Sequence, residues 1–283
     1  MKDGLETIKQ VNLLILDEIH RVSECIGVNC FLLAGTMLGA VREGDFIPWD
    51  DDADVGMLRA DYQRFLEEAP KLLKPEFELV LPQQFGGFYD MIAKVSYRRS
   101  RLHKETEEDA FYGGYSARIS VDLYVLDAAA PGQAAFALQI FRLKMVYGMM
   151  MRYRYRVKDI HYTLLEHAQV LVLRTMGHFR RLDSLRKEYE RICRKYEHKK
   201  YEQLFVSNSV LQKIDVRYDK QWFSQFQPVF LKGHSYRIPL QSDEILKARY
   251  GSDYMTPKKE TFTIVHADLA EVEVWTEERE ETL

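Results

Sequence analysis

Four aspartates lie within one five-residue stretch, and side chains of this type at this spacing could bind a ligand or take part in catalysis. Carboxylates this close repel one another, so a fold retains them where a polar surface or a cation compensates. The leading interpretation is a metal site, and the alternative is a solvated acidic turn, since Asp and Pro are typical turn residues. The four are Asp50, Asp51, Asp52 and Asp54, and they lie in a longer motif that runs from Phe46 to Met57 and includes Pro48.

The spacing of the last two aspartates favours the metal site. From Asp52 onward, apolar residues alternate with polar or small ones, which predicts a short β-strand with Asp52 and Asp54 on the same face. Two carboxylates separated by one residue on a rigid strand suit Mg²⁺ or Mn²⁺, which must keep open positions for water and phosphate. We expect Asp50 and Asp51 to shape the approach turn or to support the site indirectly.

A third carboxylate, Asp122, interrupts an otherwise apolar alternating run at residues 119–127, which predicts a strand. A lone carboxylate in such a strand requires a partner. On a neighbouring strand it could reach the same cation as the aspartate pair, as a two-metal phosphoryl-transfer site requires. The alternative is an ion pair between Asp122 and either Lys94 or Arg118.

A glycine turn is expected to place a phosphate beside these acids. Residues 31–34 predict a short buried strand, and Gly35 then leads into a helix with Thr36 at its N-cap or in its first turn. Glycine lets the backbone approach a ligand closely, and the N–H groups at a helix start attract an oxyanion. Thr36 would then face a phosphate, although a Gly-Thr pair before a helix is also a common cap.

The remaining periodicities predict the elements that carry these residues. Apolar residues recur at helical spacing over residues 5–24, 59–73, 133–199 and 242–250, with breaks near residues 158–159 and Gly177. Strands are predicted at residues 77–81, 91–97 and 261–267, and short strands or irregular structure at residues 226–239. We divide the chain into a catalytic core at residues 1–130, a basic helical segment at 131–225, and a C-terminal segment at 226–283 that returns to the core.

The composition bounds the class of protein. With 283 residues, 46% of them hydrophobic and 29% charged, the chain can bury a sizeable core as a globular protein. Its three cysteines show no CxxC spacing, so neither a zinc site nor a disulfide framework is expected. No apolar run of signal-peptide length opens the chain, and the apolar stretch 134–151 contains Arg142 and Lys144. The sequence therefore predicts a cytoplasmic protein without a membrane span.

Charge is unevenly divided along the chain. Residues 131–200 contain 16 Lys or Arg and 6 Asp or Glu, although the whole chain has a net charge of -3. Such a segment suggests contact with an anionic surface or substrate, for which the inner face of the cytoplasmic membrane or an anionic lipid-linked acceptor would fit. A solvated helical face is the alternative. The alternation of Arg and Tyr at residues 152–156 lies in no recognised nucleic-acid module, so no nucleic-acid partner is expected.

Several uncommon motifs in a fixed order resemble the signature of the LicD family of phosphotransferases. They span roughly residues 10–127 and 230–266 of the chain. One departure is Tyr124-Val125, where the family usually has Phe-Pro. The motifs are Gly35-Thr36-Met37-Leu38-Gly39 with Arg42, the run from Phe46 to Asp54 with Met57, Val121-Asp122-Leu123-Tyr124-Val125-Leu126-Asp127, Ile238-Pro239, and Tyr250-Gly251-Ser252-Asp253-Tyr254-Met255 with Pro257.

The resemblance implies an α+β fold with a nucleotidyltransferase-like core, in which helices flank a small mixed sheet, plus a helical insertion. It also implies transfer of a phosphorylated alcohol, phosphocholine in the best-known members, from a CDP-linked donor to a cell-surface glycan or lipid-linked sugar acceptor. Carried over to this chain, Asp52, Asp54 and Asp122 would be the ligands of Mg²⁺ or Mn²⁺. Gly35 and Thr36 would lie on the phosphate side.

The other candidate residues would assist the transfer. Asp122 could accept the proton of the attacking hydroxyl, and Arg42, Lys94 or Arg118 could neutralise phosphate oxygens. Two rival functions stay open. The first is transfer of a nucleoside monophosphate from an NTP to a small hydroxylated acceptor, and the second is a non-catalytic subunit of a glycan-assembly complex.

Overall fold

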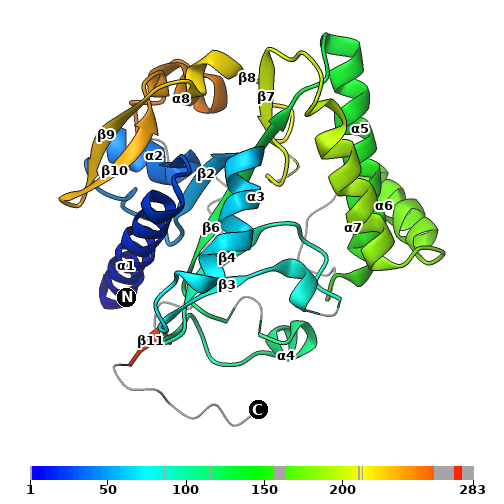
Figure 1. Ribbon diagram of the computed structural model, residues 1–283. Helices are drawn as coiled ribbons and strands as arrows, with labels where there is room; N and C mark the ends of the chain where they lie inside the picture. The colour runs from blue at the N-terminus through cyan, green and yellow to red at the C-terminus, as the bar shows by residue number, and fades with distance from the viewer. Residues whose placement is uncertain are drawn as a thin grey trace.

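A seven-stranded mixed sheet lies at the centre of the protein, whose architecture is given by a computed structural model (Figure 1). The structure describes residues 2–85, 87–114, 117–155, 164–209, 211, 213–257 and 271–275. The strand order is β1-β2-β6-β4-β3, with β7 paired to β6 and β8 paired to β7. The predicted α+β class, a mixed sheet flanked by helices, is therefore confirmed. The strands are β1 (Cys30–Leu32), β2 (Asp54–Leu58), β3 (Phe77–Val80), β4 (Ala93–Tyr97), β6 (Ser120–Ala128), β7 (Gln203–Val206) and β8 (Tyr218–Asp219).

Strand β6 organises the sheet because three strands pair with it. It runs parallel to β2 and antiparallel to β4 and β7. Between β4 and β7, the side chain of Asn208 takes the place of a strand. Its Nδ2 donates to the carbonyl of Leu123 and its Oδ1 accepts the N–H of Val125, both at 3.0 Å. These backbone groups of β6 are thus bonded where a strand is missing.

Helices α1 and α3 lie side by side against one face of the sheet (Figure 1). Helix α1 follows the periodicity predicted for residues 5–24, with Ile8, Ile15 and Ile19 buried. It ends where Gly27 adopts a φ of 74°, a left-handed conformation that favours glycine. The helices are α1 (Lys2–Ile26), α2 (Ala34–Arg42), α3 (Arg59–Glu68), α4 (Glu107–Tyr112), α5 (Gln133–Met150), α6 (Leu164–Gly177), α7 (Leu182–Cys193) and α8 (Ser242–Tyr250).

A buried ion pair joins α3 to the sheet. The guanidinium of Arg59 bonds both carboxylate oxygens of Asp127 on β6, at 2.8 and 2.5 Å. Arg59 also reaches Glu190 of α7 at 2.7 Å, and the hydroxyl of Ser207 donates to Asp127 at 2.6 Å. This network connects α7 of the helical segment to α3 and to strand β6 of the sheet.

Helices α5 and α7 share an apolar core of their own, built from residues such as Phe136, Leu143 and Leu185, and α6 packs against α5 to complete the helical unit. The predicted break at Gly177 is confirmed because α6 ends there, whereas the break near residues 158–159 lies outside the described residues. Strands β7 and β8 come from the last part of the 131–225 segment and pair with the main sheet, so this segment is not helical throughout. The division into domains stays a prediction.

The C-terminal part of the chain returns to the N-terminal half. Hairpin β9 (Phe226–Leu231) and β10 (His234–Pro239) forms the predicted short strands and lies beside α1 and α2, and α8 ends at Gly251 as predicted (Figure 1). The charged connection after β4 contains α4 and β5 (Ser100–Arg101), which periodicity did not predict, and β5 pairs with β11 (Glu273–Val274). The strand predicted at 261–267 lies outside the described residues. None of the helices in the described part of the chain is both long and apolar enough to cross a membrane.

Candidate active site

Asp54 and Asp122 lie directly opposite each other on neighbouring strands. They are register partners in the parallel pair β2 and β6, which places both side chains on the same face of the sheet. Strand β2 starts at Asp54, so Asp52 precedes the strand and does not lie on it as predicted. The chain turns at residues 47–50, where the N–H of Asp50 donates to the carbonyl of Ile47. After this turn, the first hydrogen bond between β6 and the acidic segment is the one to the carbonyl of Ala53.

Negative charge is concentrated and buried at this point. Asp54 is only 6% exposed, and no described Lys, Arg or His forms an ion pair with it. Burial raises the pKa of Asp54 well above its usual value, and the charges of Asp52, Asp122 and Asp50 raise it further. A buried carboxylate surrounded by like charges needs a cation or a proton to compensate it.

Lys94 forms an ion pair with the third aspartate. Its Nζ lies 3.1 Å from Oδ1 of Asp122, with the two side chains 20% and 19% exposed. Burial alone would lower the pKa of Lys94, but the carboxylates of Asp122, Asp90 and Asp52 raise it above its usual value. The ion pair expected as the alternative for Asp122 is therefore present with Lys94, whereas Arg118 pairs with Glu78 on β3.

The first turn of α2 packs against the acidic segment. A Cβ at Gly35 would lie 2.8 Å from Oδ2 of Asp50, so glycine permits this close approach. Thr36 lies in the first turn, as expected, but its buried hydroxyl accepts the N–H of Asp54 at 2.8 Å. Its oxygen thus holds the start of β2, and the expectation that Thr36 faces a phosphate stays a prediction.

Arg42 lies at the opposite end of α2 from Gly35 and Thr36. Its Nε forms an ion pair with Glu43 at 2.7 Å, and its Nη1 donates to the carbonyl of Tyr254 at 3.2 Å. These contacts connect α2 to the turn after α8. The structure gives Arg42 no ion pair with the aspartates.

Lys9 supports the acidic turn from α1, and the sequence analysis did not identify it. Its buried Nζ donates to the carbonyls of Ile47 and Pro48, at 3.0 and 3.3 Å. Burial lowers the pKa of Lys9, while the charge of Asp45 raises it. A lone lysine among the core positions of an amphipathic helix was the available signal, because such a lysine requires partners.

Arg249, near the end of α8, is the second residue that the sequence analysis missed. Its Nε is buried without a hydrogen-bond partner, and no carboxylate of the described residues forms an ion pair with it. Its guanidinium lies 5.8 Å from the ring centre of Tyr250. Its charge lowers the pKa of Asp54 and of Tyr124, which burial raises, so the guanidinium acts on the acidic cluster. The available signal was its position next to the Tyr250-Gly251 motif.

The donor chemistry at this site suits a hard cation, but the ligands do not converge. Among the described residues, no group of three or more His, Cys, Asp or Glu side chains is arranged to hold a metal ion. The carboxylate of Asp122 is held by Lys94. The oxygens of Asp52, Asp54 and Asp122 fit Mg²⁺ or Mn²⁺ in type and charge, and rotation of side chains would have to bring them together.

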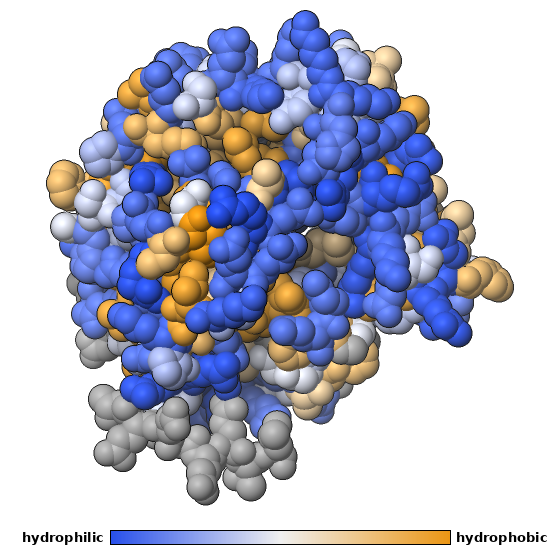
Figure 2. Space-filling model, viewed as in Figure 1, coloured by the Kyte–Doolittle hydropathy of each residue, from blue (hydrophilic) through white to orange (hydrophobic). Residues whose placement is uncertain are grey.

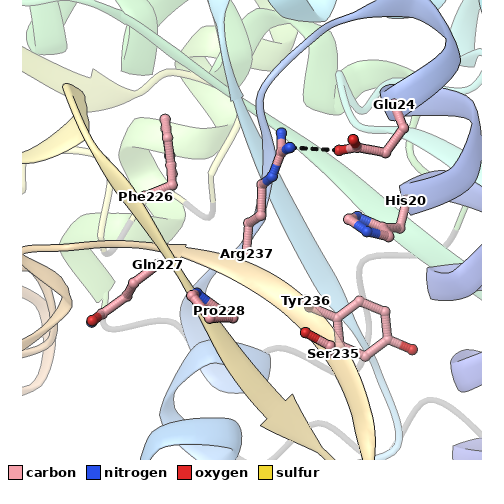
Figure 3. Close-up of a pocket in the computed structure, with 8 residues that line it drawn as sticks. All are labelled: His20, Glu24, Phe226, Gln227, Pro228, Ser235, Tyr236 and Arg237. Atoms are coloured by element: carbon pink, nitrogen blue, oxygen red, sulfur yellow. Dashed lines mark ion pairs between the residues drawn. The ribbon is translucent and has the colours of Figure 1, made fainter.

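A separate cavity of about 240 Å³ lies between α1 and the β9–β10 hairpin (Figure 3). An ion pair of 2.7 Å between Arg237 and Glu24 crosses it. None of the aspartates of the acidic site lines this cavity. Its lining consists of His20, Glu24, Phe226, Gln227, Pro228, Ser235, Tyr236 and Arg237.

Comparison with known proteins agrees with the motifs. Residues 27–112 match the family described as LicD/FKTN/FKRP, nucleotidyltransferase domain. This stretch includes Asp52, Asp54 and Lys94, whereas Asp122 lies beyond it. The resemblance to the LicD family is confirmed over the matched residues.

Two kinds of curated relative match shorter stretches. The lipopolysaccharide cholinephosphotransferase LicD of Haemophilus influenzae is 49% identical over 53 residues, which are 19% of this chain and 20% of that protein. The ribitol 5-phosphate transferases FKRP of Mus musculus and Homo sapiens are 50% identical over 40 residues, which are 14% of this chain and 8% of theirs. The matches thus span a fifth or less of the length of these relatives.

Proposed function

We propose that the protein is a metal-dependent phosphotransferase, which moves a phospho-alcohol group from a CDP-linked donor to a hydroxyl of a glycan or lipid-linked sugar. The observation that carries the proposal is the placement of Asp54 opposite Asp122, with Asp54 buried and lacking a described ion pair. The names of the relatives, a cholinephosphotransferase and ribitol 5-phosphate transferases, support the class of group transferred.

In this proposal, Asp52, Asp54 and Asp122 hold Mg²⁺ or Mn²⁺. The bound cation would neutralise the negative charge of the donor diphosphate and would lower the pKa of the attacking hydroxyl. Lys94 exchanges its bond with Asp122 for one with a phosphate oxygen. Thr36 keeps the backbone of Asp54 in place through its 2.8 Å hydrogen bond.

The transfer itself is a displacement at phosphorus. The acceptor oxygen attacks the phosphorus atom that bears the alcohol, the bond between this phosphorus and the bridging oxygen breaks, and CMP leaves with that electron pair. Asp122 accepts the proton of the hydroxyl. Arg249 binds a phosphate of the CDP-linked donor, because its guanidinium already acts on this cluster.

The products test the proposal. Purified protein is incubated with Mg²⁺ and CDP-choline, CDP-ribitol or CDP-glycerol, together with a lipopolysaccharide or glycan acceptor. CMP release that stops with a chelator supports the proposal, and retained release in Asp54→Asn contradicts it. Asp61→Asn is the matched control, because Asp61 lies on α3, where it accepts the N–H of Asn29 at 3.2 Å.

A second candidate is transfer of a nucleoside monophosphate from an NTP to a hydroxylated acceptor. The description of the matched family as a nucleotidyltransferase domain favours it. Pyrophosphate release from an NTP, with none of the CDP-alcohols consumed, supports this candidate over the first. A protein that consumes neither donor and binds no divalent cation fits the non-catalytic subunit.

A further inference from the structure

Helix α6 turns a stripe of apolar side chains outward. Leu171, Val172 and Met176 are exposed, and Leu171 is 67% exposed. Their spacing places them on one side of the helix. Phe179 follows in the turn after the helix, where its N–H donates to the carbonyl of Met176, and it is 86% exposed. Figure 2 shows orange groups among blue ones along the edge of the molecule where α6 lies.

The opposite side of α6 is tightly packed, so this outward orientation is fixed. Gly148 of α5 leaves no room for a Cβ beside Leu173, since the two would lie 2.4 Å apart. Gly177 similarly lies against the backbone of Met149. The exposed stripe is therefore a property of the packed helix pair.

Cations surround the stripe. Residues 133–181 contain nine Lys or Arg and two Asp or Glu, a net charge of +7, and the remainder of the chain carries -10. Arg142 and Lys144 on α5 and Arg181 at the start of α7 are exposed. Helix α5 also exposes Leu138 and Phe141. Apolar side chains flanked by exposed cations are typical of helices that lie in the interface of an anionic bilayer.

The positive charge of this face also indicates whether a second copy of the chain or a lipid surface would cover it. A second copy placed with the same face inward would bring the exposed cations Arg142, Lys144 and Arg181 of one copy against those of the other, which opposes association. An anionic lipid surface instead attracts the cations and accepts the apolar stripe in its headgroup region. The acidic remainder of the chain would then be held away from the lipid.

We propose that α6, with the adjoining turn at Phe179 and the exposed cations of α5 and α7, docks the protein on the surface of an anionic lipid membrane. The docking is peripheral, with the apolar stripe in the headgroup region and the cations beside the lipid phosphates. It does not depend on the proposed reaction.

Co-sedimentation of the full chain with lipid vesicles tests this docking. Wild-type protein should sediment with mixed phosphatidylcholine and phosphatidylglycerol vesicles, and stay in solution with pure phosphatidylcholine. The double variant Leu171→Ser and Phe179→Ser should lower the bound fraction about tenfold, because the apolar anchor is lost. The triple variant Arg142→Gln, Lys144→Gln and Arg181→Gln should bind weakly and lose the salt dependence of the wild type.

Matched controls lie outside helices α5, α6 and α7. Phe230→Ser removes a 64% exposed side chain from β9, and the triple variant Lys71→Gln, Arg101→Gln and Lys220→Gln removes three exposed cations. Both should bind as the wild type does. Failure of the wild type to bind mixed vesicles overturns the proposal, as does equal binding by the α6 variant. A wild-type dimer that the α6 variant dissociates, seen by sedimentation velocity, would assign the face to a contact between copies.

Discussion

The acidic end of the sheet and the basic outer helices carry opposite charges and hold them in opposite ways. At the sheet, backbone register places the buried Asp54 opposite the partly buried Asp122. In the helices, cations are spread over the surface, paired with nearby acids as Arg180 is with Glu188 at 2.7 Å, or bonded to backbone carbonyls as Arg152 is to Gly177 at 3.2 Å. Only the first arrangement concentrates enough negative charge to attract a divalent cation, whereas the second suits a diffuse anionic surface.

Several cations and tyrosines of the helical segment form hydrogen bonds that hold neighbouring elements together. Tyr153 donates its hydroxyl to the carbonyl of Arg180 at 3.2 Å, and Tyr112 accepts the N–H of Tyr155 at 2.5 Å. The alternation of Arg and Tyr at residues 152–155 therefore ties α5 to α4 and to the turn after α6. Charge density alone does not distinguish a chemical site from a packed surface.

Removing one carboxylate from the sheet should have the largest effect. Asp54→Asn is expected to lower transfer on the order of a thousandfold or more, because a metal ligand is lost from a group of residues that act together. Its melting temperature should stay the same or rise, since repulsion between buried like charges is relieved. Glu188→Gln in the helical unit is the control, and an equal loss of activity there would break the comparison.

The connection between the two regions should be the next most sensitive point. Arg59→Met leaves the buried carboxylate of Asp127 without its cation, which is expected to cost about 3–5 kcal/mol in the free energy of unfolding. Urea unfolding measures this cost. Arg64→Met removes an exposed ion pair of 3.5 Å with Glu68 and a bond of 2.7 Å to the carbonyl of Ile26, and should cost no more than about 2 kcal/mol. Similar costs for both variants would show that the network does not join the regions.

Arg249 should contribute to donor binding without holding the fold. Arg249→Lys keeps the charge but loses the planar guanidinium, so KM for the donor is expected to rise about tenfold with a smaller change in kcat. Steady-state kinetics separate the two constants. A loss of kcat alone, with KM unchanged, would assign Arg249 to the chemical step.

The smallest effect is expected in the basic helices. Arg142→Gln, Lys144→Gln and Arg181→Gln together should change transfer to a water-soluble acceptor by less than about twofold, because exposed charges act weakly over distances longer than about 8–10 Å in salt. A large loss with a soluble acceptor would give these helices a direct part in the reaction.

The sequence predicted elements whose signal is local. Periodicity located α1, α8, the helical segment and the strands that carry Asp54 and Asp122, and the family motifs pointed to the same aspartates. Periodicity placed Asp52 on the strand, because the alternation of apolar and polar residues cannot show at which residue the pairing with a neighbouring strand begins. Lys9 and Arg249 were missed because Lys9 bonds carbonyls 38 and 39 positions away and the charge of Arg249 acts on the distant Asp54, which no local pattern encodes. The bond from the N–H of Asp54 to Thr36 was not predicted, because it depends on the packing of α2 against β2.

Binding of Mn²⁺, followed by electron paramagnetic resonance, tests most directly whether the acidic end of the sheet is a cation site. Titration of the wild type should remove the signal of free Mn²⁺ with a saturable site, and addition of a CDP-alcohol should tighten the binding. Asp54→Asn should leave the Mn²⁺ free, while Asp61→Asn should bind as the wild type does. Free Mn²⁺ throughout the wild-type titration, or equal binding by Asp54→Asn, would contradict the account.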